Sequence, residues 1–120
     1  IGKVHIPIEV LNKPEEFSDQ DWELMRNHPW WGAAEIFSLK GINESSMNIA
    51  IPAFEHHMNC DHSGYPDVGH DMELDLFSRI IAIADRYDAM TSCRVYAKRA
   101  IPPDRALQIM YERSGSELDF

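Results

Sequence analysis

The sequence of residues 74–91, LDLFSRIIAIADRYDAMT, decides the fold of this chain. Its apolar side chains recur every three or four residues, as they do along one face of an α-helix. That face is broad and comprises Phe77, Ile80, Ile81, Ile83, Ala84, Tyr87 and Met90. Because so wide an apolar face is typical of a helix at the centre of a domain, we expect this helix to be mostly buried.

Four further segments have helical spacing, and no segment alternates apolar and polar residues over the length of a strand. They run from the N-cap Ser18 towards His28, from Trp30 to Leu39 with a stop at Gly41, from Asn43–Ser46 around Pro52 to His57 or Met58, and from Pro103 to Gly115. Two long irregular stretches, Gly2–Glu16 and Asn59–Glu73, lie between helices. The sequence therefore predicts an all-α fold, a helical bundle of about five helices.

Length and charge limit what the chain can be. Its 120 residues predict a single domain over residues 1–120. Eleven basic and twenty acidic residues give a net charge of -9, which repels polyanions, so we expect no nucleic-acid polymer as a partner. No apolar run approaches the roughly eighteen residues of a membrane span, so we expect no membrane segment. Two cysteines without CxxC spacing favour a reducing cytoplasm.

Histidines and aspartates form the best chemical signal in the sequence. His56 and His57 adjoin at the end of a predicted helix, and His28 lies at the end of another. Imidazoles and carboxylates together suit iron, manganese or zinc, with iron or manganese favoured where carboxylates bridge two ions. Asp85 lies in the helix expected to be buried, so it must be protonated, paired with a cation or bound to metal. Asp88 shares its face and is placed to support the site.

Several motifs also occur in the order found in one family. His56-His57 is followed by Ser63-Gly64-Tyr65-Pro66 and then by RIIAIADRYDAMTS at residues 79–92. Further matching segments are Ile1–Pro7, Leu11–Pro14, Met25–Pro29 and Ser114–Ser116. Together these segments resemble the HD-GYP domain family, part of the HD superfamily of metal-dependent phosphohydrolases, over essentially the whole chain.

The resemblance implies a phosphodiesterase that hydrolyses cyclic di-GMP to linear pGpG, GMP or both in bacterial signalling. It implies two or three ions, most often iron or manganese, with a metal-bound hydroxide as nucleophile. The implied metal ligands in this chain are His28, His56, His57 and Asp85. The implied substrate-binding residues are Lys3, Arg94 and Lys98. The implied second shell and loop comprise Asp88, Asp61, Gly64, Tyr65 and Pro66.

The same resemblance implies partners. These are a cyclic dinucleotide substrate and neighbouring GGDEF-type, sensor or receiver domains, as in a two-component response regulator. The family's His-Asp dyad would come just before Ile1, so we expect a domain incomplete at its N-terminus and an isolated chain that is inactive. Met58 also stands where the family commonly has Glu, and His62 where it has Gly. Two alternatives therefore stay open: hydrolysis of another cyclic nucleotide, and a degenerate, non-catalytic domain that binds a nucleotide or a partner.

Overall fold

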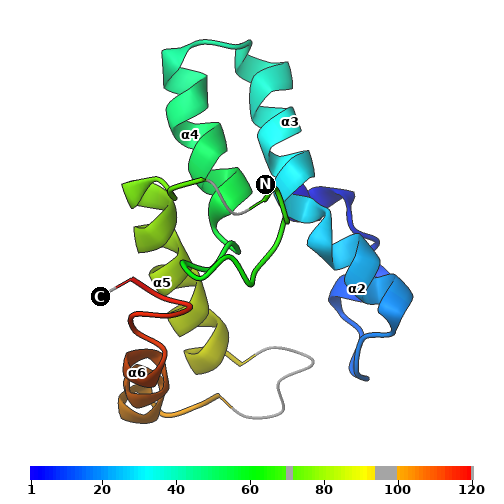
Figure 1. Ribbon diagram of the computed structural model, residues 1–120. Coiled ribbons are helices and arrows are strands. Elements are labelled where there is room, and N and C mark those ends of the chain that lie inside the picture. The colour runs from blue at the N-terminus through cyan, green and yellow to red at the C-terminus, as the bar shows by residue number, and fades with distance from the viewer. Residues whose placement is uncertain (70–71, 94–99, 120) are drawn as a thin grey trace.

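The computed structural model describes residues 1–69, 72–93 and 100–119. In chain order the elements are η1 (Gly2–His5), α1 (Ile8–Leu11), α2 (Asp19–Arg26), α3 (His28–Lys40), α4 (Glu44–Glu55), α5 (Leu76–Thr91) and α6 (Pro103–Glu112). Over these ranges β-structure is limited to one bridge between Ser114 and Leu118. The predicted all-α fold is confirmed (Figure 1). None of the described helices is both long and apolar enough to cross a lipid bilayer.

Helices α3 and α4 form an antiparallel hairpin (Figure 1). Gly41 ends α3 with a φ of 68°, a conformation that favours glycine. Asn43 then caps α4 by accepting a hydrogen bond from the Ser46 amide at 3.0 Å, and the Ser46 hydroxyl accepts one from the Asn43 amide at 2.9 Å. The two helices enclose a small core of Ala33, Ile36 and Ala50, flanked by Phe37, Ala53 and Phe54. This hairpin places the start of α3 beside the end of α4.

Most helix ends lie within two residues of their predicted positions. Helix α3 begins at His28 rather than Trp30, because Pro29 fits the first turn, where its missing N–H group costs no hydrogen bond. Helix α5 begins two residues late, at Leu76, and the Asp75 carboxylate caps it by accepting from the Phe77 amide at 2.8 Å. Helix α6 ends three residues before Gly115. The stretch Gly2–Glu16, predicted as irregular, contains the short helices η1 and α1.

The burial predicted for helix α5 is wrong. Ser78 is its one buried residue, whereas the exposed fractions of Phe77 and Ile80 are 62% and 52%. Helix α5 packs against α4 and α6, and its apolar face stays open to solvent in the described part of the chain. An apolar stripe marks a face that can be buried, but it does not specify which segment covers it.

The residues after α6 return to the middle of the molecule. Leu118 is buried, and the carbonyl oxygen of Glu117 accepts a hydrogen bond from the Cys60 amide at 3.1 Å. Arg79 of α5 donates to the Asp119 carboxylate at 2.6 Å. This C-terminal turn, residues 113–119, therefore connects the loop that follows α4 to helix α5.

Candidate metal centre

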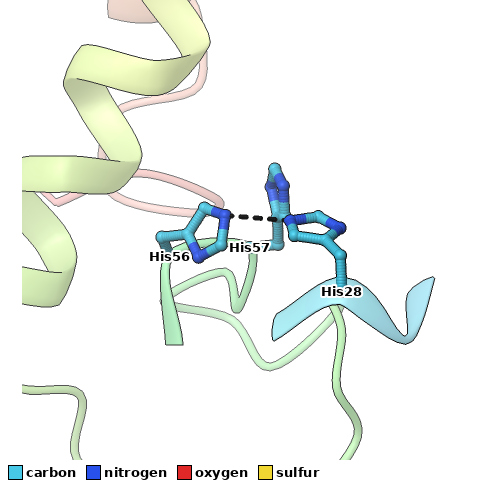
Figure 2. A group of neighbouring side chains, drawn as sticks. All are labelled: His28, His56 and His57. Carbon is cyan, nitrogen blue, oxygen red and sulfur yellow. Dashed lines mark hydrogen bonds between the residues drawn. The ribbon is translucent and has the colours of Figure 1, made fainter. Parts of the chain in front are cut away.

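Three histidines, here called the histidine cluster, meet at the open end of the α3–α4 hairpin (Figure 2). His28 is the first residue of α3, His56 is the C-cap of α4, and His57 follows it. One ring nitrogen of each lies within 4.8 Å of one from each of the others. The structure thus brings together the three imidazoles that the sequence selects as ligands, while their binding of metal stays a prediction.

Backbone carbonyl groups orient two of these rings. Nδ1 of His28 donates to the carbonyl oxygen of Met25 at 2.7 Å, and Nδ1 of His56 donates to that of Ala53 at 3.0 Å. Because a carbonyl oxygen can only accept, both Nδ1 atoms carry a proton, and each Nε2 of the neutral ring presents a lone pair. The two Nε2 atoms face each other at 3.2 Å (Figure 2).

Two lone pairs that face each other at this distance repel, and a cation that both nitrogens bind would relieve the repulsion. A second proton on one ring would supply it, but burial lowers the pKa of His28 to about 4 and holds the pKa of His56 below its usual value. Burial is the main cause that lowers the pKa of His57 to about 2, and the charges that His56 and His28 would carry lower it further. A divalent ion fits the arrangement, because two nitrogens about 2.1 Å from one ion lie roughly 3.0–3.4 Å apart at bond angles of about 90–110°.

The carboxylate of Asp85 lies beside the histidine cluster. Its Oδ2 is 3.9 Å from Nδ1 of His57. The Asp85 side chain is 32% exposed, so the sequence argument that deep burial forces this carboxylate to find a cation is wrong. The ligand atoms that all lie within 4.8 Å of one another come from the three histidines and not from Asp85, so its role as a metal ligand stays a prediction.

Gly2 brings Lys3 next to the same site. A Cβ atom on Gly2 would lie 1.8 Å from the carbonyl oxygen of His28 and 2.6 Å from the Gly32 nitrogen. Helix η1 can therefore pack on the start of α3 only because residue 2 has no side chain. Lys3, half-buried, consequently lines the same cavity as His57.

The Gly64-Tyr65-Pro66 segment folds back onto His57. The Tyr65 amide donates to the carbonyl oxygen of His57 at 3.0 Å, and a Cβ atom on Gly64 would lie 2.1 Å from that oxygen. The Tyr65 and His57 rings are in contact, with centroids 4.7 Å apart. Pro66 is buried after a cis peptide bond. Glycine is therefore required at residue 64, and the turn supports the His57 ring.

Comparison with known families identifies the family of this chain. A family model described as the HD domain matches residues 1–120. The chain belongs to the HD domain family. The membership that the motifs indicate is thereby confirmed.

The HD domain is similar to several curated phosphodiesterases. It is 38% identical to a cyclic di-GMP phosphodiesterase of Vibrio cholerae, over 99% of this chain and 25% of the relative. It is also 38% identical to the cyclic di-GMP phosphodiesterase response regulator RpfG of Xanthomonas campestris, over 99% of this chain and 31% of the relative. A 3'3'-cGAMP-specific phosphodiesterase of Vibrio cholerae is 31% identical over 99% of this chain and 25% of the relative. The chain thus spans about a quarter to a third of these relatives.

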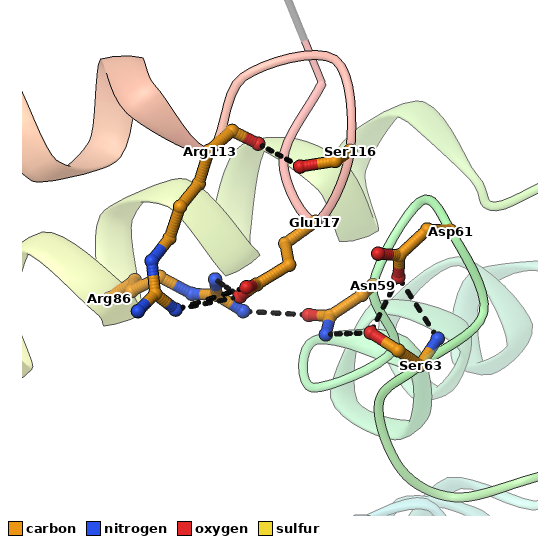
Figure 3. A network of polar contacts seen from close by, with 7 residues as sticks. All are labelled: Asn59, Asp61, Ser63, Arg86, Arg113, Ser116 and Glu117. Atoms are coloured by element: carbon orange, nitrogen blue, oxygen red, sulfur yellow. Dashed lines mark hydrogen bonds and ion pairs between the residues drawn. The ribbon is translucent and has the colours of Figure 1, made fainter.

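Arg86 connects three segments of the HD domain, namely helix α5, the loop after α4 and the C-terminal turn (Figure 3). Its guanidinium group donates to Asn59 Oδ1 and to Glu117 Oε2, both at 2.6 Å. Because Asn59 comes two residues after His57, this pair of hydrogen bonds fixes the backbone that carries a candidate ligand. Sequence reasoning misses Arg86, although a cation directly after Asp85 in an otherwise apolar helix was a usable signal.

The remaining predicted site residues lie in different places. Asp61 accepts from the amide and the hydroxyl of Ser63, at 3.0 and 2.6 Å, and so holds the turn before Gly64 (Figure 3). Asp88 is exposed and accepts from the Ser92 hydroxyl at 2.8 Å, so its support of the metal site stays a prediction. The predicted substrate-binding residues outside the described ranges are Arg94 and Lys98.

A cavity of about 1020 Å³ opens beside the histidine cluster. Its lining includes Lys3, His57, Tyr65 and Asp85, together with side chains from residues 11–25. The volume matches the upper end of the range for small-molecule sites, about 300–1,000 Å³. A ligand of dinucleotide size can therefore reach the candidate metal centre.

Proposed function

We propose that this HD domain hydrolyses a phosphodiester bond of a cyclic dinucleotide, with cyclic di-GMP as the first candidate and linear pGpG or GMP as products. One observation carries the proposal. The Nε2 lone pairs of His28 and His56 face each other at 3.2 Å, beside a cavity of about 1020 Å³. Such an arrangement suits a divalent ion that meets a phosphate ester.

The histidine cluster and Asp85 would hold the ions, for which iron or manganese is the first choice. Bound divalent ions supply Lewis-acid polarisation of the phosphoryl oxygen and activation of water at neutral pH. The protein's own contribution is to keep the imidazoles neutral, since burial holds the pKa of His28 at about 4. Their Nδ1–H groups stay bonded to carbonyl oxygens, which directs Nε2 towards the ion.

We assign one substrate phosphate to Lys3, which lines the cavity together with His57 and Asp85. A chain with a net charge of -9 repels phosphates from most of its surface, so a cation at this point gives the substrate its orientation. Arg94 and Lys98 are proposed as further phosphate contacts. Tyr65 acts on the substrate indirectly, by holding the ring of His57.

The names of the relatives suggest candidate substrates and partner domains. Some are named for cyclic di-GMP and others for 3'3'-cGAMP, so both dinucleotides are candidates here. Because one relative is a response regulator, a receiver domain is a suitable neighbour, and a sensor or GGDEF-type domain is a second candidate. We place the reaction in the cytoplasm, as both cysteines are free thiols.

The test uses the purified gene product that contains residues 1–120. It is loaded with Fe²⁺ or Mn²⁺, incubated with cyclic di-GMP and 3'3'-cGAMP, and assayed for linear dinucleotides and mononucleotides. We expect metal-dependent product formation, and loss of it in a His56→Ala variant with an unchanged melting temperature. Asp67→Asn, an exposed change that can keep the hydrogen bond to Gly69, is the matched control.

The non-catalytic alternative predicts a different outcome of the same experiment. Met58 is buried where the family commonly has a carboxylate, which is the observation in its favour. Protein that binds metal and cyclic dinucleotide but releases no product with either ion would contradict the hydrolase proposal and favour a binding module.

A further inference from the structure

The residues that line the cavity fall into two chemically different groups. Lys3, His57 and Asp85 belong to or adjoin the candidate metal centre. The second group comes from residues 11–25, whose lining side chains are mainly apolar or aromatic, with carboxylates at Glu15 and Glu16. A ligand that contacts both groups must therefore combine a phosphate with a flat, apolar part.

Two aromatic side chains, Phe17 and Trp22, belong to the lining from residues 11–25. Trp22 is 44% exposed although it lines the cavity, and its ring meets Phe17 edge to face with centroids 5.4 Å apart. An exposed indole of this kind offers a stacking surface for a nucleobase. Two neighbouring interactions fix the wall: Ser18 and Asp21 form the capping box of α2, and Lys13 pairs with Asp21. The stacking surface is therefore largely preformed.

The carboxylates of Glu15 and Glu16 decide which part of a nucleotide can lie there. Two negative charges repel a phosphate, so the second phosphate of a cyclic dinucleotide does not face this wall. A carboxylate accepts hydrogen bonds, and guanine presents two adjacent donors, N1–H and the N2 amino group, on one edge. Adenine pairs its amino group with an acceptor on the same edge and cannot satisfy a carboxylate at both positions.

We propose that residues 15–22 form a purine subsite in which Trp22 stacks on the base and the Glu15 and Glu16 carboxylates select guanine over adenine. The inference rests on the proposed function, because it places the phosphate of the same nucleotide at the histidine cluster. It assigns specificity to a wall separate from the metal ligands, so the two can be tested independently.

The experiment compares kcat/KM for cyclic di-GMP, 3'3'-cGAMP and cyclic di-AMP in the manganese-loaded, full-length protein. Bis(4-nitrophenyl) phosphate, which carries no purine, reports the metal centre alone. The variants are Glu15→Gln with Glu16→Gln, and Trp22→Ala. Matched controls outside the cavity wall are Glu23→Gln on α2 and the exposed Trp30→Ala on α3. Mn²⁺ affinity and melting temperature are measured for each variant.

We expect the wild type to favour cyclic di-GMP over cyclic di-AMP at least about tenfold, and the double Gln variant to reduce that preference about tenfold. Trp22→Ala should raise KM for cyclic dinucleotides about tenfold without changing Mn²⁺ affinity. Equal kcat/KM for the three dinucleotides, or a preference that survives the double Gln change, would overturn the purine subsite and leave the hydrolase intact. Hydrolysis of bis(4-nitrophenyl) phosphate without hydrolysis of any cyclic dinucleotide would instead refute the proposed function.

Discussion

The α3–α4 hairpin and helix α5 bring their candidate ligands to one place by different means. In the hairpin, His28 and His56 each donate a hydrogen bond to the carbonyl oxygen three residues earlier, and a packed core joins the two helices. Helix α5 is largely exposed in the described part of the chain, and the Asp85 carboxylate approaches His57 at 3.9 Å. The imidazole side of the centre is therefore preformed, whereas the carboxylate side is held loosely.

The preformed imidazoles and the loosely held carboxylate indicate an order of assembly for the site. Rigid imidazoles with neutral rings can bind an ion first, and the ion can then draw the carboxylate into coordination. The affinity for metal should accordingly depend more strongly on the histidine cluster than on Asp85.

The first prediction compares one ligand from each region. His56→Ala removes a preformed nitrogen ligand and should weaken Mn²⁺ binding by at least about a hundredfold, whereas Asp85→Asn should weaken it about tenfold. Both changes should abolish most hydrolysis, because each disturbs the position of the ions. Binding is measured from the electron paramagnetic resonance signal of free Mn²⁺. Equal losses of affinity in the two variants would remove the distinction between the regions.

The second prediction concerns pH and the metal-free protein. The pKa of His28 is about 4 in the folded protein and 6.5 in the unfolded chain. On acidification, the unfolded chain therefore binds a proton at His28 at a higher pH than the folded protein does. The contribution of His28 to the free energy of unfolding should be constant above about pH 6.5. It should fall by on the order of 3 kcal/mol between pH 6.5 and pH 4. Urea unfolding across this range measures it. A His28→Gln variant should show a shallower slope, and an identical slope would contradict the assignment.

The third prediction concerns the connection between the two regions. Arg86→Met leaves Asn59 and Glu117 without their shared donor and should lower Mn²⁺ affinity between about tenfold and a hundredfold, with partial rescue by Arg86→Lys. Arg113→Met is the matched control, because Arg113 pairs with the same Glu117 at an exposed position. It should change stability by no more than about 0.5 kcal/mol. Equal Mn²⁺ affinities of Arg86→Met and the wild type would show that Arg86 plays no positioning role.

Local signals in the sequence predicted the helices well. Ser18 and Asn43 are N-caps through hydrogen bonds to nearby amides, whereas Gly41 ends a helix and Pro103 begins one through their own backbone conformations. The histidine cluster was accessible through motif order, since each residue lies at a helix end that the sequence marks.

Features that depend on distant packing were less predictable. The exposure of α5 was missed because periodicity reports the shape of one face and nothing about its partner. The role of Arg86 was missed because its partners, Asn59 and Glu117, lie 27 and 31 residues away. The cavity wall at Trp22 likewise needs three-dimensional placement, because residues 11–25 carry no motif for a base.

The most direct test of a cation between the imidazoles is a crystal structure of the full-length, manganese-loaded protein, with data collected at the manganese absorption edge. We predict an anomalous peak about 2.1–2.3 Å from Nε2 of both His28 and His56. The Asp85 carboxylate, now 3.9 Å from Nδ1 of His57, should move towards the ion. A fully loaded protein in which the peak lies elsewhere, with those two Nε2 atoms still 3.2 Å apart, would contradict the account.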